Sequence, residues 1–61
     1  MEYYIIIQIL DNGSDIIHSI SLDEEDARQI YNDLNVSNKS LVCYSVDTRG
    51  RVTSETQILW T

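Results

Sequence analysis

The sequence predicts a two-layer α+β domain in which one helix lies on one face of a four-stranded antiparallel sheet. Its 61 residues leave room for one hydrophobic core, so we expect a single domain over 1–61. Four segments rich in β-branched and aromatic residues flank one amphipathic stretch, two on each side, which gives the order ββαββ. One helix can cover only one face of the sheet, so the other face is expected to stay uncovered.

The first two strands are predicted over residues 3–10 (YYIIIQIL) and 15–20. Asn12 and Gly13 between them tolerate positive φ and predict a two-residue hairpin turn. A turn of this length fixes the register of the strands. The expected pairs are Ile9–Ile16, Ile7–His18 and Ile5–Ile20.

A helix is predicted over residues 22–34. Ser21 and Glu24 have the spacing of a capping box at its start, and Asn35 is expected to end it in a left-handed conformation. The helical period places four apolar residues on one side, which should face the sheet. These residues are Ala27, Ile30, Tyr31 and Leu34.

The last two strands are predicted over residues 41–47 and 51–60. Between them we expect a three-residue loop with Gly50 in the left-handed region. The resulting pairs are Val46–Val52, Tyr44–Ser54 and Val42–Thr56. A helix that returns between the two hairpins favours the strand order 2-1-3-4.

Alternation along these strands places apolar side chains on both faces of the sheet. We expect the helix to cover the face that holds Ile5, Ile7, Ile9, Ile16, Ile20, Val42, Tyr44, Val46, Val52, Ile58 and Trp60. The other face is then too apolar for a freely solvated sheet, and it predicts a homodimer or a protein partner. The partner-binding residues expected there are Tyr4, Ile6, Leu10, Ile17, Leu41 and Leu59, and Cys43 is expected on the same face.

The charge balance excludes some classes of function. With 4 Lys and Arg against 10 Asp and Glu, the net charge is −6, which argues against direct binding of nucleic acid. One cysteine and one histidine form neither an internal disulfide nor a four-ligand zinc site, so we expect no metal and no cofactor. No segment has the length of a membrane span or the pattern of a signal peptide, and a cytoplasmic location is expected.

Three residues are candidates for catalysis. His18 has no nucleophile or carboxylate fixed beside it by the sequence, and Cys43 lies on a strand without a neighbouring base. We therefore predict a non-enzymatic interaction module. The alternative is a small enzyme or ligand-binding protein with a site formed across a dimer interface from His18, Cys43 or Tyr44.

An acidic surface is expected along the helix, from Asp23, Glu24, Glu25, Asp26 and Asp33. Negative charge in the first turn stabilises a helix, and a charged surface maintains solubility. The same carboxylates could imitate the phosphates of a nucleic acid in a basic groove of another protein. The sequence leaves both interpretations open.

The segments YYIIIQIL, SLDEEDARQIYNDL and DTRGR, taken in this order, resemble the small uncharacterised ββαββ proteins of phage and mobile-element type. In this pattern Ala27 and Tyr31 face inward from the helix. The resemblance extends over most of the chain and includes no site residues. It implies a small accessory protein, including inhibitors of host enzymes or defence systems that act in the host cytoplasm.

Overall fold

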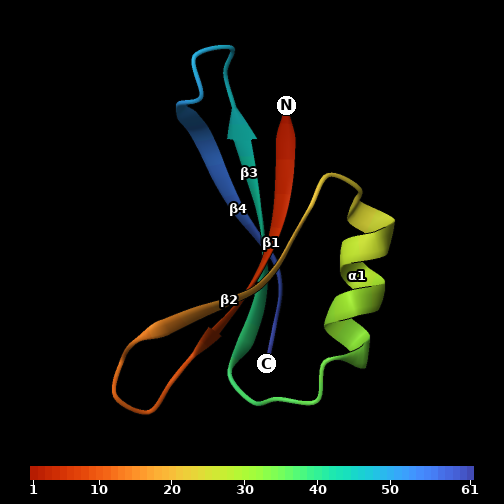
Figure 1. The fold of residues 1–61 in the computed structure, drawn as a ribbon, viewed down its shortest axis with the longest axis vertical. Coiled ribbons are helices and arrows are strands. Elements are labelled where there is room, and N and C mark those ends of the chain that lie inside the picture. The colour runs from red at the N-terminus through yellow and green to blue at the C-terminus, as the bar shows by residue number, and fades with distance from the viewer.

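The structure, a computed structural model of residues 1–61, is a four-stranded sheet with one helix packed on it (Figure 1). The elements are β1 (Glu2–Ile9), β2 (Asp15–Ser21), α1 (Glu24–Asp33), β3 (Lys39–Val46) and β4 (Val52–Trp60). The sheet order is β2-β1-β3-β4, and every neighbouring pair is antiparallel. The predicted α+β class, the ββαββ order and the strand order are all confirmed.

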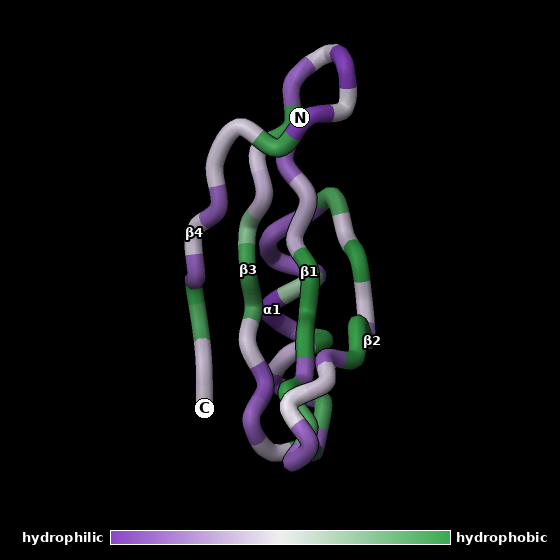
Figure 2. Tube along the Cα trace, turned by 90° about the vertical axis from the view of Figure 1, so that its left-hand side faces the viewer, coloured by the Kyte–Doolittle hydropathy of each residue, from purple (hydrophilic) through white to green (hydrophobic).

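The chain crosses the sheet once, through α1. Strands β2 and β3 both pair antiparallel with β1, so they run parallel to each other, and α1 connects them. Figure 2 shows α1 behind the sheet while β2 and β3 lie on either side of β1, which makes the connection right-handed. Nearly all parallel connections have this hand, and it determines which side of the sheet receives the helix.

The β1–β2 hairpin differs from the predicted two-residue turn. The Leu10 amide donates to the Ser14 carbonyl at 2.8 Å, which leaves a three-residue loop with Gly13 at φ 86°. Because the loop is one residue longer, Ile9 pairs with Asp15 and Ile7 with Ile17. A register shift that leaves His18 unpaired then restores the predicted Ile5–Ile20 pair.

The β3–β4 loop is confirmed as predicted, with Gly50 at φ 85°. One carboxylate oxygen of Asp47 accepts from the amides of Arg49 and Arg51, each at 2.9 Å, and so holds the loop in shape. The Val46–Val52 pair is confirmed.

Farther along this hairpin, the predicted pairing is wrong. Tyr44 lies opposite Glu55 and not Ser54, and Val42 lies opposite Gln57 and not Thr56. The cause is a register shift beside Val46, and a second one lies beside Val42. Such bulges insert an extra residue and are not encoded by strand alternation.

Helix α1 is shorter than predicted at both ends. Asp23, and not Ser21, is the N-cap, and its side chain accepts from the Glu25 amide at 3.2 Å. The Ser21 hydroxyl instead bonds to the backbone of Asp23, in a turn before the helix. At the other end Leu34 is extended, and the only non-glycine residue with positive φ is Asn38, at 56°, rather than Asn35.

The core lies between α1 and the sheet, and it consists of Tyr4, Ile6, Ala27, Tyr31, Leu41 and Cys43, with Leu34, Ile58 and Leu59 packed against it. The inward positions of Ala27, Tyr31 and Leu34 are confirmed, whereas Ile30 is 41% exposed. The predicted choice of sheet face is wrong, because the helix covers the face of Tyr4 and Leu41; of the residues assigned to the covered face, Ile58 does pack against the core. Both faces are apolar, so alternation alone does not distinguish them, and the hand of the crossover makes the choice.

Candidate functional site

The uncovered face of the sheet is the candidate functional site. It faces the viewer in Figure 2, with α1 behind it. We call it the open face and define it by ten residues of the four strands, which line two adjoining shallow hollows: Tyr3, Ile5, Ile7, Ile9, Ile17, Ile20, Val42, Tyr44, Val46 and Val52. One of these hollows is lined by eight side chains, all of them hydrophobic. Three of its members, Ile17, Ile20 and Val52, are about 60% exposed.

The predicted partner-binding set is therefore largely wrong. Tyr4, Ile6 and Leu41 are buried under α1, and Leu59 packs against the same core. Leu10 is half-buried next to the β1–β2 loop. Of the six residues, only Ile17 lies on the open face, where the register shift in β2 pairs it with Ile7.

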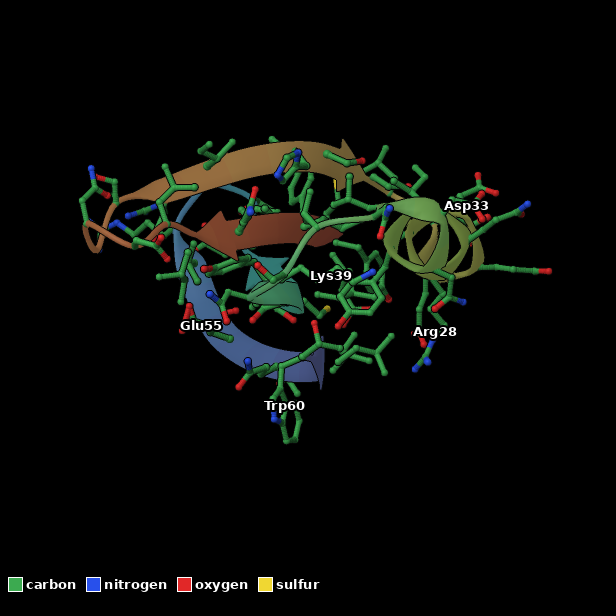
Figure 3. The ribbon with its side chains drawn as sticks, turned by 90° about the horizontal axis from the view of Figure 1, so that it is seen from below. Arg28, Asp33, Lys39, Glu55 and Trp60 are labelled. Atoms are coloured by element: carbon green, nitrogen blue, oxygen red, sulfur yellow. The ribbon has the colours of Figure 1, made fainter.

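The sequence predicts most of the open-face residues on the helix side of the sheet. The prediction that both faces carry apolar side chains is nevertheless confirmed, since a large apolar surface remains after α1 has covered the other face. The signal for these residues is present in β1, where isoleucines alternate onto both faces. Trp60, at the end of β4, is 67% exposed and extends away from the body of the molecule in Figure 3.

Polar side chains border the open face on one side. Asp15, Ser40, Glu55 and Gln57 line one hollow together with Tyr44. The Glu55 carboxylate, which lies opposite Tyr44 on β4, and then burial raise the pKa of the Tyr44 hydroxyl. Tyr44 is thus an aromatic residue with a polar end at the margin of an apolar surface, a residue type common in protein interfaces.

The two ends of the open face differ in charge. Arg49 and Arg51 are exposed in the β3–β4 loop, and they are two of the four basic residues of the chain. Asp11 and Asp15 are exposed at the β1–β2 loop. Figure 1 shows the two loops at opposite ends of the long axis, both on the side of the sheet away from α1.

The three candidate catalytic residues do not form one cluster. The imidazole of His18 is exposed and lies 2.9 Å from the side-chain oxygen of Gln8. Cys43 is buried in the core, and burial together with the nearby Glu2 carboxylate raises the pKa of its thiol, which disfavours the nucleophilic thiolate. Tyr44 lies on the opposite face of β3 from Cys43.

The raised pKa values of three side chains predict that the fold loses stability at alkaline pH. Burial, and then the Glu2 carboxylate, also raise the pKa of Tyr4, so Tyr4, Cys43 and Tyr44 all have higher pKa values in the folded chain than their ordinary 10.0, 9.0 and 10.0. Folding therefore favours their neutral forms. The stability that they contribute is fully present below about pH 9 and is lost as the pH rises through the folded values.

We expect the urea midpoint to fall between about pH 9 and 11, and to fall less in a Tyr4→Phe, Tyr44→Phe double variant. A double variant with the same alkaline slope as the unsubstituted chain would contradict this expectation.

The acidic residues of the helix lie on its exposed side or at its start. Asp23 is the N-cap, and Glu24 accepts from Arg28 at 2.8 Å. Asp26 and Asp33 line a groove between β2 and α1, and Figure 3 shows Asp33 on the outer side of the helix. Two of the five carboxylates thus have local structural roles, and phosphate mimicry stays a prediction.

Comparison of the chain with protein-family models, curated proteins and solved structures finds no match. The single helix is too short and too polar to cross a membrane. No three histidine, cysteine or carboxylate side chains are grouped so that they could hold a metal ion.

Proposed function

We propose that this protein is a small acidic interaction module that acts without catalysis, by binding a protein surface on its open face. One observation carries the proposal: eight hydrophobic side chains line one hollow of the open face, and three of them, Ile17, Ile20 and Val52, are exposed on the two edge strands. Soluble monomers rarely expose so large an apolar patch, whereas protein interfaces have an apolar centre with a polar margin.

The small core supports the same proposal. Only seven of 61 residues are buried, while nine large hydrophobic side chains are exposed. At ~25 cal/mol per Å2, covering a few hundred Å2 of apolar surface contributes several kcal/mol, which is similar to the whole stability of a domain of this size. A partner that binds the open face therefore also stabilises the folded state.

The test is the substitution Ile17→Lys, with Leu22→Lys as its matched control. Ile17 and Leu22 are similarly exposed, at 58% and 63%, but only Ile17 lies on the open face. Both variants should therefore fold, and a charge within the apolar interface should weaken binding by at least tenfold in Ile17→Lys alone.

The measurements are self-association by sedimentation and capture of protein from an extract of the native cell, followed by titration of the purified partner. The proposal is wrong if Ile17→Lys and Leu22→Lys behave alike in both.

A further inference from the structure

We infer that the open face binds a second copy of this chain in an antiparallel, two-fold arrangement that places the β3–β4 loop of each copy at the end occupied by the β1–β2 loop of the other. This inference rests on the proposed function, because it names the partner of the same face. Three observations carry it: the charges at the two loops, the position of the remaining carboxylates and the twist of the sheet.

The loop charges make the open face complementary to itself. Arg49 and Arg51 outnumber Asp47 at one end, whereas Asp11 and Asp15 lie at the other. A two-fold axis across the strands brings unlike ends together at both ends of the interface. A two-fold axis along the strands brings arginine to arginine and aspartate to aspartate, which is unfavourable.

Half of the carboxylates lie away from the open face, whereas Asp15 and Glu55 lie at its margin. Five of the ten carboxylates belong to α1 or its N-cap, on the side of the sheet opposite to the open face: Asp23, Glu24, Glu25, Asp26 and Asp33. In the dimer these carboxylates lie on the two outer layers, with both sheets between them. Their mutual repulsion is therefore weakened by distance and by salt.

The shape and size of the face suit a copy of itself. Twisted sheets pack face to face because their surfaces have the same hand of twist. A stable interface needs about 800 Å2 from each partner, which is less than a fifth of the 4364 Å2 surface of this chain. The open face extends along the 34 Å long axis and is apolar over its centre, so it is the surface that meets this need.

Charge reversal at one residue of each loop tests the arrangement. Arg51→Glu and Asp15→Arg each place like charges together at both ends of an antiparallel dimer, and the double variant Arg51→Glu, Asp15→Arg restores unlike pairs. Arg28→Glu and Asp33→Arg, both on α1, change the net charge by the same amounts away from the face. The measurement is the dimer dissociation constant by sedimentation equilibrium at about 0.01 M ionic strength, where the Debye length is ~30 Å.

We expect a dimer for the unsubstituted chain and a dissociation constant about tenfold higher for each single loop variant than for its control on α1. The double variant should return to within about threefold of the unsubstituted chain. Single variants that match their controls would show that unlike ends do not meet, and would overturn the antiparallel arrangement.

The same measurements separate this inference from the proposed function. The unsubstituted chain could stay monomeric at several hundred micromolar and still bind another protein that the Ile17→Lys variant does not bind. This result would overturn the inference that the partner is a second copy, and would leave the proposed function standing. A chain whose self-association and protein binding are both unchanged by Ile17→Lys overturns both proposals.

Discussion

Replacing Leu41 by alanine is expected to remove a large part of the stability of the fold at 25 °C. The Leu41 side chain has no exposed surface and lies in the core between β3 and α1. Truncation of a fully buried leucine lowers the free energy of unfolding by about 2–5 kcal/mol. A domain of this length has only about 3–9 kcal/mol of stability in total, so one such cavity removes a large part of it.

Leu22→Ala is the matched control, because it removes the same atoms from a leucine that is 63% exposed and outside the core. We expect this control to lower stability by less than about 0.5 kcal/mol. Urea unfolding followed by far-ultraviolet circular dichroism, at one fixed protein concentration, provides the comparison. Equal urea midpoints for the two variants would mean that α1 does not cover the face of Leu41, and that the face assignment made from the sequence is correct.

The two faces of the sheet show which features of the fold can be predicted from the sequence and which cannot. Turn chemistry and residue periodicity predict the element order and the Gly50 loop, because both depend on residues near one another in the sequence, and the strand order follows from a helix that returns between the two hairpins. The choice of face depends on contacts between distant elements. In β1, Tyr4 and Ile6 alternate with Ile5 and Ile7, so both faces are apolar and the helix fits the pattern of either.

The register of the strands was harder to predict for a related reason. Each hairpin has register shifts, and in β2 the shift at His18 transfers the residues before it to the opposite face relative to the predicted pairing. Ile16 therefore pairs with Gln8 instead of Ile9, and Ile17 joins the open face. The apolar character of the site was predictable, whereas the membership of individual residues was not.

Lys39 provides the link that holds α1 over the covered face. Its ammonium group donates to the carbonyl oxygens of Tyr31 at 2.6 Å and Leu34 at 2.7 Å, and it lies 4.4 Å from the centre of the Tyr31 ring. Figure 3 shows Lys39 between the sheet and the helix. The last turn of α1 contains no basic residue of its own, so Lys39 from β3 supplies the positive charge that the C-terminal end of the helix favours.

Lys39→Met, which retains an apolar stem of similar length, is expected to lower the free energy of unfolding by about 2 kcal/mol. The loss combines two hydrogen bonds from a charged donor with the favourable helix-end and ring contacts, and part of it is recovered when water binds the freed carbonyls. For a domain of this size, the melting temperature should fall by roughly 10 °C. Because the helix end is no longer anchored, amide exchange at Tyr31 and Leu34 should accelerate more than exchange in β1.

Arg28→Met is the control for this experiment, because it removes one positive charge from an exposed pair with Glu24 on the same helix. An exposed pair of this spacing contributes only about 0.3–0.5 kcal/mol, so the control should melt within a few degrees of the unsubstituted chain. If Lys39→Met and Arg28→Met lose the same stability, the effect is one of net charge, and the Lys39 contacts do not hold the helix. If Lys39→Met alone loses it, a single cross-layer contact helps to keep α1 on one face of the sheet and so leaves the other face open for binding.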